Sequence, residues 1–350
     1  MLNFWKKSRK NASARSGPVL GGVDLGPRPW LVLGGGGLKG LTHLGVWRAL
    51  RKKGFEPAGI LGTSIGALVG ACLAAEREVE ELILLAKELE RTDIARIQRR
   101  ALWISGFRAQ ALFREQPLRD YLEELLPPGG WDALVVRFQT NAVEINRGRT
   151  EWFGVGARTD VTLAQAIYAS AALPVFYPPA RLPGGVYVDG GVEFALPLHR
   201  AAELGATGIV AVDPGAGEEA DANKVVTGGM LAMHQRVFSI MSGRLRRDAL
   251  THWDGVPLLY IRPRLDGYGT FDFEHVPYFL EEGERAGKEA LGDAEPALAR
   301  ASGSGGASGS DVWEDPMVRM ESGRGGPSAD LEVEDGPGAS SSGTGAQSSG

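Results

Sequence analysis

The stretch GTSIG, residues 62–66, decides the fold because it separates two apolar runs of different length. Residues 59–61 predict a short buried strand, and residues 64–75 predict an apolar helix. The pattern G-x-S-x-G between a strand and a helix is typical of a nucleophile elbow, which holds its serine, here Ser64, on a sharp turn. Gly62 and Gly66 lack a Cβ, so the strand and the helix can approach closely. The pattern also fits a glycine-rich turn whose serine caps the helix.

A run of glycines precedes the elbow in LVLGGGGLKG, residues 31–40. Gly35, Gly37 and Gly40 fit the dinucleotide fingerprint G-x-G-x-x-G, typical of nucleotide-dependent oxidoreductases. That fingerprint needs an acidic residue about twenty positions later, at the end of the second strand, to bind the ribose. The second strand ends at Leu61 and is followed by GTSIG, which contains no acid. The oxidoreductase hypothesis therefore lacks its confirming residue.

The glycine run also fits a loop that binds an oxyanion. Acyl transfer needs backbone N–H donors for the developing charge, and one donor often comes from a nearby strand-to-helix loop. Residues 34–37 follow a predicted strand at residues 30–33. If this strand neighbours the strand at residues 59–61 in a parallel sheet, both loops open at the same edge.

A general base for the serine is sought next. In VYVDGG, Asp189 ends a predicted strand at residues 186–188, and Gly190 and Gly191 free the backbone to turn away from its carboxylate. An ordinary hairpin turn explains the same residues. Histidine is the usual base, but none stands in a strand-end loop flanked by small residues, so each is a weak candidate. The histidines are His43, His199, His234, His252 and His275.

The motifs GGGGLKG, GTSIG and VDGG, with ASAALPVFYPP (residues 169–179) between the last two, resemble the patatin-like phospholipase family. The resemblance runs from about residue 28 to residue 292 and is closest to the short bacterial type without an extra domain. It implies a Ser–Asp dyad, with Ser64 as nucleophile and Asp189 as base.

The resemblance also implies supporting roles. Backbone N–H groups of Gly35, Gly36 and Gly37 form the oxyanion hole, Lys39 braces that loop, and Ser170 is structural. It implies a hydrolase acting on acyl lipids through an acyl-enzyme, with no cofactor and no metal ion. A non-catalytic lipid-binding or scaffold protein of the same fold, and an acyltransferase, remain alternatives.

Alternating strands and helices predict an α/β fold: a three-layer sandwich with a mainly parallel central sheet. Further strands are predicted at residues 134–143, 150–155, 208–213 and 258–262, and further helices at residues 38–53, 79–89, 115–126, 163–172 and 279–291.

Composition predicts one domain at residues 28–295 between two disordered tails. Residues 1–27 are basic, and residues 296–350 are rich in glycine and serine and acidic. The apolar stretch at residues 101–113 is either a lipid-facing lid or a segment packed over the sheet. Residues 57–75 and 161–180 are long enough to span a bilayer, but their glycines and prolines favour buried elements.

The net charge of −5 gives no argument for a nucleic-acid partner. Cys72 is the only cysteine, which fits a reducing compartment, and no secretory signal precedes the domain. We therefore expect a cytoplasmic protein, with peripheral membrane contact and oligomeric state left open.

Overall fold

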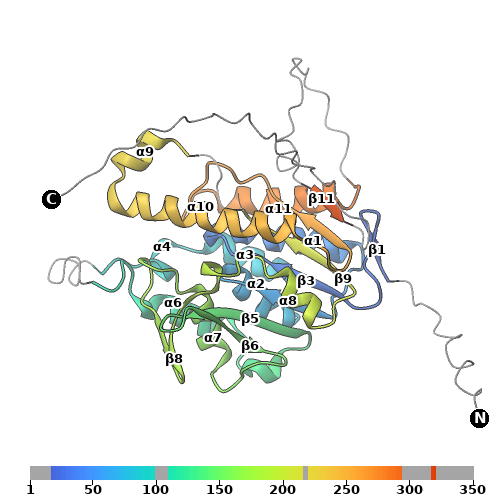
Figure 1. Ribbon diagram of the computed structural model, residues 1–350, viewed down its shortest axis with the longest axis horizontal. Coiled ribbons are helices and arrows are strands. Elements are labelled where there is room, and N and C mark those ends of the chain that lie inside the picture. The colour runs from blue at the N-terminus through green and yellow to red at the C-terminus, as the bar shows by residue number, and fades with distance from the viewer. Residues whose placement is uncertain (1–16, 99–108, 216–219, 294–316, 321–350) are drawn as a thin grey trace, which may run out of the picture.

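A mixed β-sheet forms the middle layer of the fold (Figure 1). The computed structural model describes residues 17–98, 109–215, 220–293 and 317–320, and within them the sheet has nine strands. Their order is β11-β10-β9-β3-β4-β5-β8-β7, with β6 also paired to β5. The strands are β3 (Pro29–Leu33), β4 (Gly59–Gly62), β5 (Arg137–Glu144), β6 (Arg149–Gly154), β7 (Ala180–Leu182), β8 (Gly185–Asp189), β9 (Gly208–Val212), β10 (Leu258–Ile261) and β11 (Met317–Met320).

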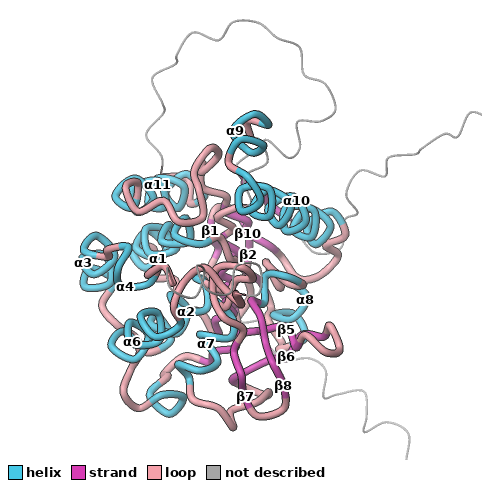
Figure 2. The backbone as a smooth tube through the Cα atoms, turned by 90° about the vertical axis from the view of Figure 1, so that its left-hand side faces the viewer, coloured by secondary structure: helices cyan, strands magenta, loops and turns pink. Residues whose placement is uncertain are grey.

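Helices cover both faces of this sheet (Figure 2). The α-helices are α1 (Thr42–Lys52), α2 (Ile65–Ala74), α3 (Val79–Glu88), α4 (Arg91–Ile94), α6 (Glu115–Leu125), α7 (Leu163–Ala171), α8 (Leu198–Glu203), α9 (Ala222–Thr227), α10 (Gly229–Thr251) and α11 (Val276–Ala290). Short 3₁₀ helices are η1 (Gly37–Leu41), η3 (Gly130–Ala133) and η4 (Gly190–Val192).

Two hydrophobic cores confirm the three-layer sandwich. Side chains of β3 alternate between them, as strand geometry requires. Leu31 and Leu33 join the core that includes α1, α2 and α11, whereas Trp30 and Val32 join the core that includes α8 and the end of α10.

The parallel part of the sheet is β10-β9-β3-β4-β5. Since β3 and β4 are parallel neighbours, the loops after Leu33 and Gly62 open at the same edge, as expected. The strand expected at residues 186–188 is β8, but it is antiparallel to β5 and forms a hairpin with β7. Two residues separate β7 from β8, too few for a parallel crossover.

The predicted domain boundaries differ from the structure at both ends. Strands β1 (Val19–Leu20) and β2 (Val23–Asp24) form a hairpin, and its apolar side chains are buried, so the predicted tail is wrong for residues 17–27. Strand β11 lies inside the predicted C-terminal tail and pairs with β10. Residues 1–16 and most of 296–350 lie outside the described residues, as do residues 101–108 of the proposed lid.

The other elements agree with the sequence, with two differences. The helix expected at residues 38–53 consists of η1 followed by α1, and helix α10 was not expected. Residues 57–75 form β4, the elbow and α2, and residues 161–180 form α7 and a loop. Among the described residues, no helix combines the length and the apolar character needed to cross a bilayer.

Candidate active site

The elbow predicted at Ser64 is present between β4 and α2. Ser64 has φ 56° and ψ −124°, a backbone conformation that non-glycine residues rarely adopt. A Cβ on Gly62 would lie 2.2 Å from the Gly66 carbonyl oxygen, and a Cβ on Gly66 would lie 2.2 Å from that of Leu33. Both glycines are therefore required for the strand and helix to approach, as the motif indicates.

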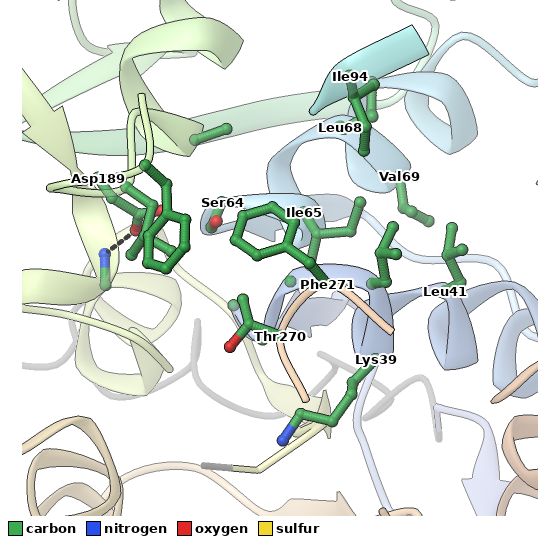
Figure 3. A pocket seen from close by; sticks show the side chains of 18 of the residues that line it. Lys39, Leu41, Ser64, Ile65, Leu68, Val69, Ile94, Asp189, Thr270 and Phe271 are labelled. Carbon is green, nitrogen blue, oxygen red and sulfur yellow. Dashed lines mark hydrogen bonds between the residues drawn. The ribbon is translucent and has the colours of Figure 1, made fainter. Parts of the chain in front are cut away.

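Strands β4 and β8 bring the two predicted side chains together from opposite directions along β5. β4 runs parallel to β5 with Gly62 opposite Thr140, and β8 runs antiparallel to it with Asp189 opposite Ala142. The carboxyl ends of these strands therefore meet two residues apart along β5. Ser64 and Asp189 line the same cavity (Figure 3).

Asp189 is a buried carboxylate with few partners. It is 2% exposed, and its Oδ1 accepts a hydrogen bond from Gly191 N–H at 2.7 Å. Burial raises the pKa of Asp189 to about 6, while hydrogen bonds from Ser64 and Gly191 act in the opposite direction. At neutral pH the carboxylate is therefore ionised, yet it is a much stronger base than a solvated aspartate.

The loop after Asp189 explains why Gly190 has no side chain. Asn141 Nδ2 donates to the Gly190 carbonyl at 3.1 Å, and Thr63 Oγ1 donates to Asn141 Oδ1 at 2.8 Å. A Cβ on Gly190 would lie 2.5 Å from Asn141 Cγ. The Asn141 amide thus connects the elbow to the aspartate loop.

The glycine loop offers fewer oxyanion donors than the sequence predicts. Gly35 N–H donates to the Ala195 carbonyl at 3.1 Å, so it is occupied. Within the described residues, the N–H groups of Gly36 and Gly37 donate to no protein acceptor. Gly35 instead allows close approach, since a Cβ there would lie 3.3 Å from Ser64 Cβ.

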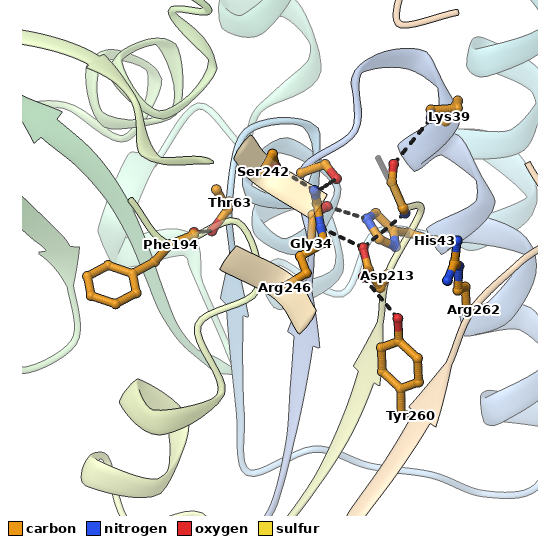
Figure 4. A network of polar contacts seen from close by, with 12 residues as sticks. Gly34, Lys39, His43, Thr63, Phe194, Asp213, Ser242, Arg246, Tyr260 and Arg262 are labelled. Carbon is orange, nitrogen blue, oxygen red and sulfur yellow. Dashed lines mark hydrogen bonds and ion pairs between the residues drawn. The ribbon is translucent and has the colours of Figure 1, made fainter. Parts of the chain in front are cut away.

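Two buried side chains hold the carbonyl groups of this loop (Figure 4). His43 Nε2 donates to the Gly34 carbonyl at 2.8 Å, and Arg246 Nη2 donates to the Gly35 carbonyl at 2.7 Å. Burial lowers the pKa of His43 to about 4, so the ring is neutral and carries its proton on Nε2. Because a peptide unit is planar and trans, fixing the Gly35 oxygen also fixes the direction of the Gly36 N–H.

Arg246 is itself fixed by a buried ion pair that sequence reasoning missed. Its Nε lies 2.9 Å from Asp213 Oδ1, and the two side chains are 6% and 3% exposed. Asp213 also accepts hydrogen bonds from Gly215 N–H and Tyr260 Oη–H. Asp213 had a signal, since it follows an apolar strand at the same sheet edge as Ser64. Arg246 had none, because it lies on the unexpected helix α10.

Replacing Arg246 with glutamine is expected to lower the free energy of unfolding by about 3–5 kcal/mol, because it leaves the Asp213 carboxylate buried without its cation. The double variant Asp213→Asn/Arg246→Gln is expected to lose less than Arg246→Gln alone. Urea denaturation of both variants measures this. Equal losses in the two would show that the ion pair does not hold the loop.

Lys39 points away from Ser64 (Figure 3). Its Nζ donates to the Gly215 carbonyl at 3.2 Å, and burial lowers the pKa of Lys39 to about 8. Ser170 Oγ accepts the Ser64 N–H at 2.9 Å and a hydrogen bond from Thr140, which fits a structural serine.

None of the five histidines, all of which are described, hydrogen-bonds to Ser64 or Asp189. His199 packs on Trp253, His252 contacts the Asp248 carbonyl, and His275 contacts Asp272. His234 lines the cavity from α10. The geometry therefore pairs the serine with Asp189 alone.

An apolar cavity extends from Ser64 between the helices on one face of the sheet. Its lining includes Leu41, Leu68, Val69, Leu82, Leu122 and Phe176. The opposite wall near Ser64 is formed by Phe238, Ser242 and Arg246 of α10 and by Phe271. Such a lining suits an unbranched hydrocarbon chain whose polar end reaches the serine.

Residues 31–202 match the family model of patatin-like phospholipases. The chain is 32% identical over 186 residues to an uncharacterised NTE family protein of Mycobacterium tuberculosis, covering 53% of this chain and 49% of that protein. It is 29% identical over 279 residues to Lysophospholipase NTE1 of Coccidioides immitis, covering 75% and 17%. The chain thus spans about half the length of the mycobacterial relative and less of the fungal one.

The rat protein named patatin-like phospholipase domain-containing protein 7 is 27% identical over 292 residues, covering 73% of this chain and 20% of that protein. Among solved structures, VipD from Legionella pneumophila aligns with a TM-score of 0.42 and 17% identity, covering 79% and 67%.

Proposed function

Because residues 31–202 make this chain a member of the patatin-like phospholipase family, we propose that it is a serine lipid acyl hydrolase that uses Ser64 and Asp189 as a dyad. The family supports lipid hydrolysis in general, and the phospholipase A or lysophospholipase activity and the residue roles are the proposal. The observation that carries it is a strained, cavity-lining Ser64 hydrogen-bonded to a buried Asp189.

The reaction proceeds in two steps. Asp189 takes the proton of the Ser64 hydroxyl as its oxygen attacks the ester carbonyl, and the carbonyl oxygen becomes an oxyanion. The N–H groups of Gly36 and Gly37 stabilise that charge, and the alcohol leaves with a proton from Asp189. Water, deprotonated by Asp189, then hydrolyses the acyl-enzyme, and Ser64 regains its proton.

The apolar cavity supports an acyl-lipid substrate. Ser64 stands at one end of a passage lined by leucine, valine and aromatic side chains, while the polar groups lie near the serine. A long acyl chain placed there would set its carbonyl beside Ser64 and lose its contact with water.

The pH dependence follows from the raised pKa of Asp189. The base must be ionised, so kcat/KM for a water-soluble ester is expected to rise with pH, with a midpoint near 6. Below the midpoint the rate should fall about tenfold per pH unit. Initial rates in constant-ionic-strength buffers from pH 4 to 9 measure this. A profile that stays flat from pH 4 to 8 would exclude Asp189 as the base.

Product analysis tests the whole proposal. Mass spectrometry of a mixed lipid extract is expected to show free fatty acid after incubation with the wild-type protein and none with Ser64→Ala. New acyl esters in place of fatty acid would identify an acyltransferase. No product, together with no labelling of Ser64 by a fluorophosphonate probe, would identify a non-catalytic lipid-binding protein.

A further inference from the structure

Helix α10 carries an apolar stripe on its outward side. The stripe consists of Met230, Met233, Val237, Ile240 and Met241, spaced three or four residues apart so that they share one helix face. These side chains are 44–72% exposed, and none packs on either hydrophobic core. In a surface helix of a globular protein the apolar face normally points inward.

The inward side of α10 is already used by the active site. Its buried residues are Ser242, Gly243, Arg246 and Leu250, and Arg246 holds the glycine loop. The helix runs along the outer edge of the fold, with α9 at its far end (Figures 1 and 2). The α10 stripe is therefore a second apolar face, separate from the one that packs on the sheet.

The stripe continues to the mouth of the Ser64 cavity. A shallow groove is lined by Val226, Met230, Met233, His234 and Val237. His234 also lines the cavity that contains Ser64. A hydrophobic phase resting on the stripe would thus lie next to the cavity.

The charges around the stripe are positive. Residues 222–247 contain five Lys or Arg residues and no Asp or Glu, although the chain has a net charge of −5. Lys224 and Arg244 are exposed, and Arg244 lies one helical turn beyond Ile240 on the same side. A twofold dimer through this face would place like charges together without any acid from the same segment. An anionic bilayer offers both an apolar phase and the opposite charge.

We propose that the α10 stripe, extended by Val226, docks this protein onto an anionic lipid bilayer with the mouth of the Ser64 cavity at the surface. Methionine suits this role because its flexible, polarisable side chain adapts to a fluid phase. The docking itself does not depend on hydrolysis, whereas its use in delivering an acyl lipid to Ser64 rests on the proposed function.

Vesicle sedimentation tests the docking. The full chain carrying Ser64→Ala, which leaves the lipid intact, is mixed with phosphatidylcholine vesicles with or without phosphatidylglycerol. We expect binding to the anionic vesicles and about 100-fold weaker partitioning when Met230, Val237 and Met241 are each replaced by Glu. Leu84→Glu is the matched control, since Leu84 is 60% exposed on another helix, α3, and its variant should bind like the parent.

A labelled variant reports contact directly. Cys72 is the only native cysteine and is buried, so a probe can be attached to Ile240→Cys in a Cys72→Ala background. An environment-sensitive dye at position 240 is expected to shift its emission to shorter wavelength when anionic vesicles are added. The same dye on Leu84→Cys is expected to show no shift.

Activity measurements separate this proposal from the proposed function. In the Ser64-containing protein, the triple Glu variant should keep its rate on a water-soluble ester and lose its rate on lipid in vesicles. Failure to hydrolyse either substrate would overturn the proposed function, while vesicle binding would still report on docking. Docking is overturned if the triple variant binds vesicles like its parent, if binding does not need the anionic lipid, or if the parent only forms a dimer that the triple variant dissociates.

Discussion

Replacing Ser64 with alanine is expected to lower kcat for ester hydrolysis roughly 10⁵- to 10⁶-fold, because the oxygen that forms the acyl-enzyme is lost. The fold should persist, since alanine at φ 56° is no more strained than serine. Initial rates on a soluble ester, with circular dichroism as a check on folding, measure this.

Ser170→Ala is the matched control for this experiment. Ser170 is also buried, but its Oγ only accepts the Ser64 N–H and a hydrogen bond from Thr140. We expect a loss of about 10- to 100-fold, because the elbow backbone loses one hydrogen bond while the nucleophile remains. A fluorophosphonate probe should label this variant and not Ser64→Ala. Comparable activity of Ser64→Ala and the wild type would contradict the dyad.

Replacing Asp189 with asparagine is expected to lower kcat about 10³- to 10⁴-fold and to stabilise the protein at the same time. The activity falls because an amide cannot take the proton of Ser64. The amide oxygen can still accept the hydrogen bond from Gly191 N–H, so the loop should keep its shape.

The stability gain follows from the pKa of Asp189, which is raised from 3.8 to about 6 in the folded protein. Below pH 4 the carboxyl is neutral in both states, so burial carries no charge penalty. Between pH 4 and 6 the unfolded chain ionises first, and stability falls as pH rises. Above pH 6 the full penalty of about 3 kcal/mol applies, and asparagine removes it.

Urea denaturation of wild type and Asp189→Asn at pH 7.5 and pH 3.5 measures this gain. The difference should be present at pH 7.5 and absent at pH 3.5. A variant that loses stability at pH 7.5, or keeps full activity, would show that the buried charge is not the base.

The sequence predicted the layers and the nucleophile because those features are local. An apolar run, a glycine-flanked serine and a second apolar run specify β4, the elbow and α2 within about fifteen residues. The loop after Leu33 was expected at the same edge, since parallel neighbours end together. The hairpin before Pro29 was missed because its strands have only two residues each, below the length at which periodicity is visible.

Helix α10 was missed for a different reason. Its stripe has helical spacing, but it begins after Gly228 and Gly229, which read as a turn, and its basic residues interrupt the apolar pattern. A helix with one face on an active site and another facing outward does not give the single amphipathic pattern that sequence reasoning seeks.

The sequence by itself determined the chemistry of the site: a serine on a turn that only glycine neighbours permit, an aspartate at a strand end, and a loop rich in N–H donors. The tertiary structure alone decided how they combine. The antiparallel pairing of β8 with β5 brings Asp189 to Ser64, the Ala195 carbonyl occupies Gly35 N–H, and Arg246 fixes the Gly35 carbonyl from 211 residues away. Local patterns encode the direction of each backbone, whereas pairing between distant segments depends on which surfaces the whole chain buries together.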